Sequence, residues 1–186
     1  LIFHGNGGHV GHRVNKFEPF INAGYGLFLL EYRGYADNPG KPSEKGLHYD
    51  ALAAIEFLSK NKIKSEKIIL YGESLGCGIA VKLSSQAEFV ATVLEAPYTS
   101  IADVAQKHYW YLPAKWLIFD KYNIIDIINT IKSPLLILHG EKDEVVDISF
   151  GKKVFSAAKE PKKSLFIPNA NHNNLFEFDV VKKILD

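Results

Sequence analysis

The sequence contains no methionine and a single cysteine among its 186 residues. One cysteine excludes an internal disulfide framework and a zinc site built from several cysteines. Because translated proteins start with methionine, a chain that opens at Leu1 within an apolar run is expected to be an internal or processed piece. Early strands, a signal peptide or a membrane anchor are segments that such a piece can lack, so the sequence predicts no compartment.

The chain also lacks an excess of charge of either sign, a long apolar run and any repeat. Lysine and arginine number 22 and aspartate and glutamate 21, which gives a formal net charge of +1. This balance argues against nucleic acid as the main partner, because phosphate binding needs clustered cations. No apolar run reaches the length of a membrane span. The composition, 47% hydrophobic and 23% charged, is typical of one globular domain with a sizeable core.

The most informative stretch is the pentapeptide Gly72-Glu73-Ser74-Leu75-Gly76. A short apolar run at 67–71 predicts a strand before it, and small and apolar residues at helical spacing predict a helix after it. A strand, a sharp turn with serine at its tip and a helix form the context in which this pattern places a nucleophilic serine. The glycines suit the strained turn because they carry no Cβ. A chance match is the alternative, so the rest of the chain must decide.

Short apolar runs alternate with helical patterns along the whole chain. Strands are predicted at 1–4, 27–32, 67–71, 89–94, 135–139 and 164–167. Helices are predicted at 10–23, from an N-cap at Ser43 to 60, from the pentapeptide to 85, at 149–159 and at 174–185. The first of these is expected to carry an apolar face made of Val14, Phe17, Phe20 and Ile21. The run at 27–32 is apolar on both faces, as expected of a central strand. This alternation predicts an α/β fold with a parallel sheet that helices cover on both faces.

Residues 98–133 interrupt the alternation and carry both tryptophans. The segment is too long for a simple crossover, so a helix and a small excursion over the edge of the sheet are expected. One interpretation is that its aromatic side chains pack the excursion onto the core. The other is that they wall the mouth of a substrate pocket, for which Tyr98, Trp110 and Trp116 are the candidates.

Candidate catalytic side chains follow the predicted strands, where function collects in open α/β sheets. A serine nucleophile needs a histidine base and an acid, and the chain order for this kind of turn is serine, acid, histidine. Of the seven histidines, His172 alone lies beyond the loop that follows 135–139, and His139 is the next candidate. Asp143 is favoured as the acid because Gly140-x-x-Asp143 places it just past the turn. The other acids of that loop are expected to be solvated: Glu141, Glu144 and Asp147.

Several segments together resemble the α/β-hydrolase superfamily and, within it, the Bem46-like group, which includes depalmitoylases of the ABHD13 and ABHD17 kind. The matching segments run in family order: 4–8, 32–35, 42–47, 72–76, 95–98, 139–146 and 171–173. The resemblance implies Ser74 as nucleophile, Asp143 as acid and His172 as base. It also implies an oxyanion hole built from the backbone N–H groups of Leu75 and Asn6. The sequence departs from the group at Ala36, Asn38 and Asp147.

The sequence thus predicts one α/β-hydrolase domain over 1–186, with a small excursion in place of a lid and with N-terminal strands missing. The predicted function is hydrolysis of carboxylic esters or thioesters through an acyl-enzyme, with a small-molecule or lipid-like acyl substrate and no cofactor. A peptidase of the prolyl-oligopeptidase type and a non-catalytic binding protein on the same fold are the alternatives.

Other charged and histidine residues carry weaker predictions. A metal site at His4, His9 and His12 is not expected, because no carboxylate or cysteine lies near them at ligand spacing. The lysine pairs 162–163 and 182–183 are expected to be solvated, and contact with an anionic membrane surface stays open. The oligomeric state is not predicted.

Overall fold

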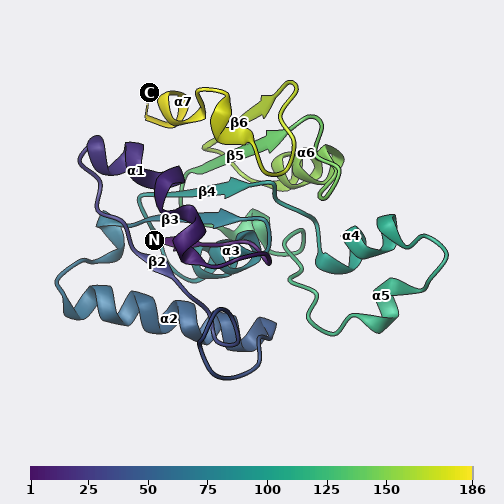
Figure 1. Cartoon of the computed structure of the whole chain (residues 1–186), viewed down its shortest axis with the longest axis horizontal. Helices are drawn as coiled ribbons and strands as arrows, with labels where there is room; N and C mark the ends of the chain where they lie inside the picture. Colours follow the sequence, from purple (N-terminus) through teal and green to yellow (C-terminus); the bar gives the residue numbers. More distant parts are fainter. Residues whose placement is uncertain (186) are drawn as a thin grey trace.

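The fold is built around a six-stranded sheet. The computed structural model describes residues 1–185. The strand order is β2-β1-β3-β4-β5-β6, and every neighbouring pair is parallel (Figure 1). The strands are β1 (Ile2–Phe3), β2 (Leu29–Leu30), β3 (Ile69–Glu73), β4 (Ala91–Glu95), β5 (Leu135–Gly140) and β6 (Lys162–Ile167). The parallel sheet predicted from the sequence is confirmed.

Helices cover both faces of this sheet (Figure 1). They are α1 (Val14–Asn22), α2 (Glu44–Lys60), α3 (Gly76–Gln86), α4 (Ile101–His108), α5 (Ala114–Leu117), α6 (Ile148–Ala157) and α7 (Val180–Leu185). One buried cluster joins α2, α3 and α6 to one face, and a second joins α1 and α7 to the other. Short 3-10 turns at 10–13, 65–67, 128–130 and 175–177 link these elements.

The alternation of side chains along the strands supplies both clusters. Leu70, Leu94 and Ile137 belong to the cluster beneath α2, α3 and α6. Tyr71 and Val93, one position away, belong to the cluster beneath α1 and α7. Burying each large apolar side chain contributes about 1.5–3 kcal/mol, so the two clusters together stabilise the sheet between its helical layers.

Helix α2 begins where the sequence predicted. Ser43 adopts an extended backbone, and its hydroxyl accepts a hydrogen bond from the N–H of Gly46 at 3.1 Å. This bond satisfies one of the backbone donors that the first turn of a helix leaves free. The predicted N-cap is therefore confirmed.

Two predictions about the first third of the chain are wrong. The run at 27–32 was expected to be a central strand, but β2 is a two-residue strand at the edge of the sheet. It pairs with β1 alone, and β1 offers only two residues for pairing. In α1, Phe17 and Phe20 are buried as expected, whereas Val14 and Ile21 are exposed because they lie outside the narrow stripe that faces the sheet.

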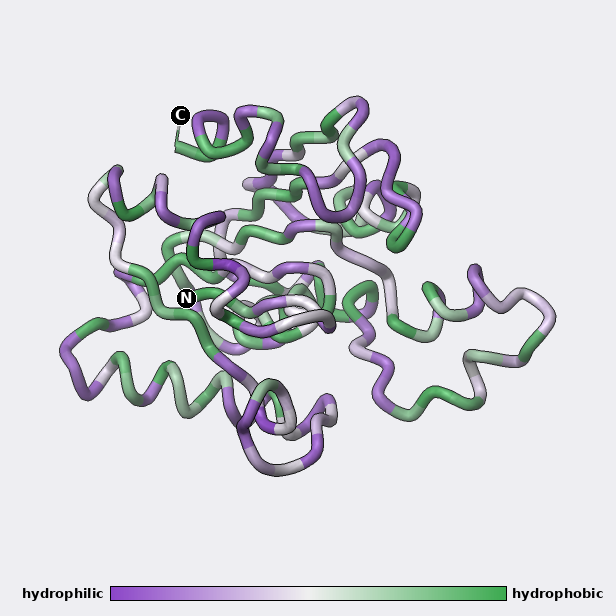
Figure 2. The backbone as a smooth tube through the Cα atoms, viewed as in Figure 1, coloured by the Kyte–Doolittle hydropathy of each residue, from purple (hydrophilic) through white to green (hydrophobic). Residues whose placement is uncertain are grey.

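The excursion at 98–133 projects beyond the sheet, with α4 and α5 at its far end (Figure 1). Its base is closed by backbone hydrogen bonds from Ile101 to Lys121 (2.8 Å) and from Ile125 to Thr99 (3.1 Å). The interpretation that its aromatics pack onto the core is wrong for both tryptophans, because Trp110 is 80% exposed and Trp116 87% exposed. At the base of the excursion Tyr98 and Tyr122 are buried, whereas the hydrophobic stretch around α5, green in Figure 2, lies away from the sheet.

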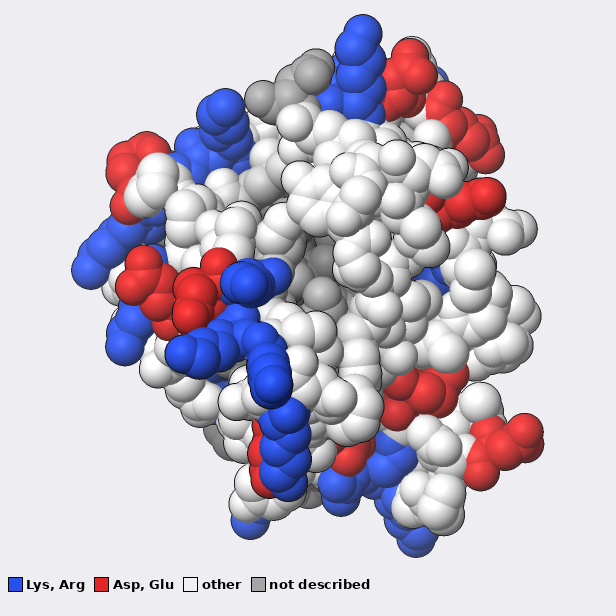
Figure 3. All heavy atoms as spheres, turned by 90° about the vertical axis from the view of Figure 1, so that its left-hand side faces the viewer, with Lys and Arg blue, Asp and Glu red and all other residues white. Residues whose placement is uncertain are grey.

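Charges of both signs are mixed on the surface opposite the excursion (Figure 3). Blue and red side chains alternate around a largely uncharged centre in this view. This distribution agrees with the net charge of +1 and gives that face no single-sign field. Within residues 1–185, no helix has both the length and the apolar character needed to cross a bilayer.

Gly76 provides a test of how tightly the sheet meets α3. A Cβ at this position would lie 2.0 Å from the carbonyl oxygen of Phe3, a backbone atom that cannot move aside. We expect Gly76→Ala to lower the free energy of unfolding by about 1–3 kcal/mol or more, measured by urea denaturation. The matched control is Gly26→Ala, because a Cβ there meets no atom within 4 Å. Equal stability of the two variants would contradict the close contact.

Candidate active site

Ser74 occupies a strained turn between β3 and α3. Its φ is +49°, in the left-handed region that residues with a side chain rarely adopt. Such a conformation costs about 1–3 kcal/mol and persists only where surrounding contacts hold it. The backbone N–H of Ser74 donates to the carbonyl of Glu95 at 2.8 Å, and Ser74 accepts from the N–H of Cys77 at 2.9 Å. A Cβ at Gly72 would lie 2.6 Å from the carbonyl oxygen of Gly76, so the turn requires glycine there.

Two backbone N–H groups close to Ser74 have no acceptor within residues 1–185. They belong to Leu75, which precedes the first turn of α3, and to Asn6, in the loop after β1. Gly5 brings this loop close, because a Cβ built on it would lie 3.4 Å from the Cβ of Ser74. The N-terminus of α3 adds partial positive charge at the same place. Together these groups could bind a negatively charged oxygen.

Ser74, Leu75 and Asn6 line one hollow of about 370 Å³. Tyr98 lines it too, and its buried hydroxyl donates to the carbonyl of Leu75 at 3.1 Å. The remaining lining comes from α2 and its approach, from the excursion and from the loop after β5: Tyr35, Pro42, Ser43, Leu47, Ile101, Val104, Asp120, Tyr122, Val145 and Val146. Most of these side chains are apolar or uncharged, so the hollow suits an uncharged, largely apolar group.

Asp143 and His172 form a hydrogen-bonded pair at the carboxyl edge of the sheet. The Nδ1 of His172 lies 2.7 Å from Oδ2 of Asp143. Oδ1 of Asp143 accepts the N–H groups of Val145 (2.9 Å) and Val146 (2.7 Å), two residues that line the hollow. A neutral imidazole that donates through Nδ1 keeps its Nε2 lone pair for a proton from elsewhere.

The environment of Asp143 keeps it ionised. Burial raises the pKa of its carboxyl, but hydrogen bonds from His139, His172 and the N–H of Val146 outweigh burial and hold that pKa well below its usual value. His139 contributes through its Nε2, 3.4 Å from Oδ2 of Asp143. A buried carboxylate with several donors is fixed in position, so it can orient the imidazole that it contacts.

The loops after β5 and β6 can touch because Gly140, at the end of β5, has no side chain to clash with the β6 loop. A Cβ at Gly140 would lie 2.4 Å from the carbonyl oxygen of Ala170. The N–H of Lys142 donates to that carbonyl at 2.9 Å. On the β6 side, the Asn171 side chain accepts the N–H of Asn173 at 2.9 Å and shapes the turn that carries His172. These contacts bring two side chains 29 residues apart within hydrogen-bonding distance.

The other candidates on the β5 loop have different surroundings. Glu141 and Glu144 are exposed. Asp147 caps α6 by accepting the N–H of Ser149 at 2.9 Å and forms a 2.6 Å ion pair with Lys107 of α4. His139 is fully buried, and its Nε2 lies 2.7 Å from the carbonyl oxygen of Val146. The sequence did not predict the structural roles of Asp147 and His139.

The structure thus brings the predicted site residues together in two groups. Within the described residues, no hydrogen bond joins Ser74 of the first group to His172 of the second. Ser74, Leu75, Asn6 and Tyr98 share the hollow, and Asp143 lies behind its Val145–Val146 wall. Trp110 and Trp116 belong to neither group.

A buried cluster of charges behind Ser74 escaped the sequence analysis. We call it the elbow cluster, and its members are Arg13, Lys16, Tyr71, Glu73 and Glu95. Lys16 Nζ lies 2.9 Å from Oε2 of Glu73 and 2.6 Å from Oε2 of Glu95, which also accepts from the Tyr71 hydroxyl. Arg13 lies 2.8 Å from Oε1 of Glu73. Glu73 stands beside Ser74 in sequence, but its partners are about 60 residues away, so no local pattern reveals them.

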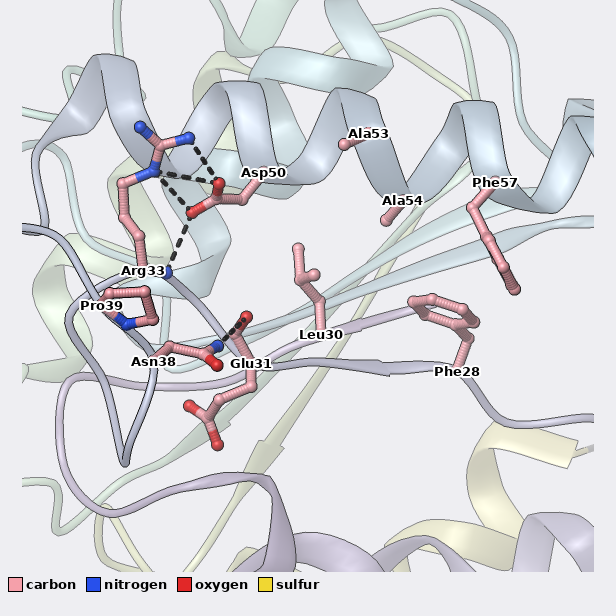
Figure 4. Close-up of a pocket in the computed structure, with 10 residues that line it drawn as sticks. All are labelled: Phe28, Leu30, Glu31, Arg33, Asn38, Pro39, Asp50, Ala53, Ala54 and Phe57. Atoms are coloured by element: carbon pink, nitrogen blue, oxygen red, sulfur yellow. Dashed lines mark hydrogen bonds and ion pairs between the residues drawn. The ribbon is translucent and has the colours of Figure 1, made fainter.

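Two further features of the first part of the chain are the buried side chain of His4 and a second hollow, and the polar side chains of both have partners within the protein. His4 is buried, stacks on Tyr32 at a centroid distance of 4.3 Å and lies 2.9 Å from Glu31. A second hollow lies between β2 and α2, where Phe28 and Phe57 face each other and Arg33 bonds to Asp50 (Figure 4). None of the predicted site residues lines that second hollow.

The depressed pKa of Asp143 predicts how stability depends on pH. A carboxyl whose folded pKa is lowered stabilises the protein above its usual value near 3.8 and loses that contribution as the pH falls through the folded value. We expect Asp143→Asn to lower the free energy of unfolding by about 1–3 kcal/mol at pH 7, and the difference from the unmutated protein to shrink below pH 3.8.

Urea denaturation between pH 7 and pH 2 measures this difference, with Glu141→Gln as the exposed control. A gap that stays constant down to pH 2 would show that the charge of Asp143 does not stabilise the fold.

Comparisons with known proteins agree with this architecture. The family described as serine aminopeptidase, S33, matches residues 1–119. The lysophosphatidylserine lipase ABHD12 of Danio rerio is 35% identical over 90% of this chain and 50% of its own length. Alpha/beta hydrolase domain-containing protein 17B of Homo sapiens is 35% identical over 94% of this chain and 60% of its own length. The chain therefore spans about half to three fifths of the length of these relatives.

Solved structures share the fold at lower identity. A monoacylglycerol lipase of Paleococcus ferrophilus has a TM-score of 0.74 at 20% identity, over 99% of this chain and 92% of that one. The alpha/beta hydrolase GrgF from Penicillium sp. sh18 has a TM-score of 0.75 at 15% identity, over 99% of this chain and 85% of that one. The chain belongs to the α/β-hydrolase superfamily, among the ABHD-like serine hydrolases.

Proposed function

We propose that this hydrolase cleaves carboxylic esters or thioesters with Ser74 as nucleophile, His172 as base and Asp143 as the orienting acid. The observation that carries the proposal is the strained turn at Ser74, which opens into the same hollow as two N–H groups without an acceptor. The Asp143–His172 pair at the same sheet edge adds the base that an unactivated serine hydroxyl needs.

The chemistry follows from these positions. Ser74 Oγ attacks the carbonyl carbon while its proton passes to Nε2 of His172, and the carbonyl π electrons move onto the oxygen. The N–H groups of Leu75 and Asn6 bind this oxyanion. Collapse of the tetrahedral intermediate expels an alkoxide or thiolate that takes the proton from His172. A water molecule then repeats the sequence on the acyl-enzyme and frees the acid.

The hollow favours a neutral acyl group on a lipid-like substrate. Ile101, Val104 and Val145 supply apolar walls, and Asp120 is the one charged residue among the described residues that line it. An anionic group inside the hollow would meet a carboxylate and no counter-ion, which is unfavourable. One relative at 35% identity is a lysophosphatidylserine lipase, which supports an acyl ester of a larger carrier as the substrate class.

A peptidase is the second candidate, because the matching family is described as a serine aminopeptidase. Amides need more transition-state stabilisation than esters, and an aminopeptidase needs anionic partners for the substrate's amino group, of which the described lining of the hollow offers Asp120 alone. Comparing a p-nitrophenyl ester with the matching p-nitroanilide separates these functions. Preference for the anilide would favour the peptidase.

The segments that follow β1, β3, β5 and β6 carry the proposed catalytic groups, and the excursion lines the same hollow, so we propose that 1–186 act as one domain with 98–133 as a small cap. Contact with a membrane surface remains a prediction. Lys162 is not part of a solvated basic pair as expected, since its Nζ donates to the carbonyls of Phe155 (2.8 Å) and Ala158 (2.7 Å) at the end of α6.

The proposed triad predicts a specific pattern of lost activity. Ser74→Ala, His172→Ala and Asp143→Asn should each lower kcat on p-nitrophenyl butyrate by about a thousandfold or more, because the three groups act together. Combining Ser74→Ala with His172→Ala should add little. Ser74→Ala should also abolish labelling by a fluorophosphonate probe, which reacts with an activated serine. Glu141→Gln is the control and should stay within about threefold.

Substantial labelling of Ser74→Ala would refute Ser74 as nucleophile. Near-normal turnover of His172→Ala would leave His139 as the base to test.

The walls of the hollow predict a dependence on acyl chain length. Each CH₂ that enters it contributes up to about 0.8 kcal/mol, or about fourfold in kcat/KM. We expect kcat/KM on linear esters to rise over the first carbons and then to level off. Val104→Trp should shift the plateau to shorter chains, because Val104 lines the hollow. Trp116→Ala should leave the profile unchanged, because Trp116 is 87% exposed and lies outside the hollow. A profile that moves with Trp116 instead would restore the far end of the excursion as the acyl site.

A further inference from the structure

The elbow cluster removes charged side chains from water, which costs desolvation free energy. The side chain of Glu95 is 3% exposed, that of Arg13 12%, that of Glu73 16% and that of Lys16 19%. Buried ion pairs often contribute little net stability compared with apolar side chains of similar volume. A cluster retained directly behind Ser74 therefore calls for a role in addition to packing.

Glu73 contacts one end of the loop that carries Asn6 directly and the other end through Arg13. Its Oε1 accepts the N–H of Gly5 at 3.4 Å, a long bond, and the guanidinium of Arg13 at 2.8 Å. The same Arg13 donates to the carbonyl of His9 at 3.2 Å. The Glu73 carboxylate thus links the serine turn to Gly5 directly and to His9 through Arg13.

The approach of this loop to the serine is tight at Gly5. A Cβ there would lie 3.1 Å from Oε1 of Glu73 and 3.4 Å from the Cβ of Ser74. The position of the Glu73 carboxylate therefore sets how closely the loop approaches. Because Asn6 follows Gly5 directly, a shift of the carboxylate would carry the Asn6 N–H with it.

We propose that Glu73 is a positioning residue that fixes the loop 5–9 against the serine turn and so aims the N–H groups of Asn6 and Leu75 at one oxyanion. This inference rests on the proposed function, since it assigns a support for the oxyanion hole. It adds that the hole is assembled through a charge network anchored on α1, whose Lys16 holds the second oxygen of Glu73 at 2.9 Å. A misplacement of about 1 Å can cost about a hundredfold in rate, so such a support would have a measurable effect.

The charge of Glu73 is fixed over the working pH range. Burial raises the pKa of this carboxyl, but Lys16 and Arg13 outweigh burial and hold it at about 2. The charged groups that face it are Arg13 and Lys16, and Lys16 is shared with Glu95. Glu73 therefore stays ionised near neutral pH, and its loss should change the height of the pH–rate profile but not its acid limb.

The test compares Glu73→Gln with Glu88→Gln, a matched change at an exposed glutamate. Glutamine keeps the size of the side chain but removes the charge and turns an N–H₂ group toward Arg13 or Lys16. We expect kcat on p-nitrophenyl butyrate to fall about 10- to 100-fold with KM within about twofold. The affinity for butylboronic acid, which forms a tetrahedral adduct with an activated serine, should fall in parallel. Glu88→Gln should match the unmutated protein in both measurements.

Stability is separated from positioning by a second variant. Glu73→Gln should also lower the melting temperature, so kinetics are measured where circular dichroism shows each variant to be folded. Arg13→Gln removes the contacts to both Glu73 and the His9 carbonyl. It should give the same split between kcat and KM, and it carries the test if Glu73→Gln does not fold. The double variant should be no slower than the slower single variant, because both changes act through one contact.

Three outcomes decide the matter. Unchanged kcat and boronate affinity in folded Glu73→Gln and Arg13→Gln would overturn the positioning role while leaving the proposed function intact. A change in KM alone, or a shifted acid limb, would also overturn it. An unmutated protein that neither reacts with a fluorophosphonate nor binds butylboronic acid would overturn the proposed function and this inference together.

Discussion

The close contact between β1, β3 and the start of α3 is the constraint on which the rest of the structure depends. Gly76 lies so near the Phe3 carbonyl that a Cβ would be 2.0 Å from it, and a Cβ at Gly72 would lie 2.6 Å from the Gly76 carbonyl oxygen of α3. This packing holds Ser74 at a positive φ and presents its side chain at the carboxyl edge of the sheet. The cost of the strained turn is offset by contacts of the surrounding core. The hollow, the free N–H groups and the elbow cluster all take their places relative to this turn.

The position of the Asp143–His172 pair depends on a different contact, between the loops after β5 and β6. Gly140 lets the loops after β5 and β6 touch, and the buried carboxylate of Asp143 then collects hydrogen bonds from both loops. Its charge makes each of these bonds stronger than a neutral one. Val145 and Val146 have two roles. Their N–H groups donate hydrogen bonds to Asp143, and both residues line the hollow. The acid is thus positioned by the same segment that shapes the substrate site.

The sequence predicted those parts that depend on local pattern or on chain order. The parallel sheet, the N-cap at Ser43 and the strand–turn–helix around Ser74 follow from periodicity and glycine placement within a few residues. The meeting of Asp143 and His172 followed from the order of functional groups at strand ends. The edge position of β2 could not be predicted, because a run of apolar residues does not reveal how many neighbours a strand has.

The remaining surprises share a cause, which is that contacts over long sequence distances leave no local signal. One interpretation of the aromatic content was burial of Trp110 and Trp116, but burial depends on whether another element covers them, and the excursion reaches past the sheet. The elbow cluster is the converse case. Arg13 and Lys16 look like surface charges on an amphipathic helix, yet they are largely shielded from solvent because two glutamates at the ends of β3 and β4 lie beneath that helix. Charge alone does not predict exposure where opposite charges converge from separate strands, and at this sheet edge that convergence ties α1 to the serine turn.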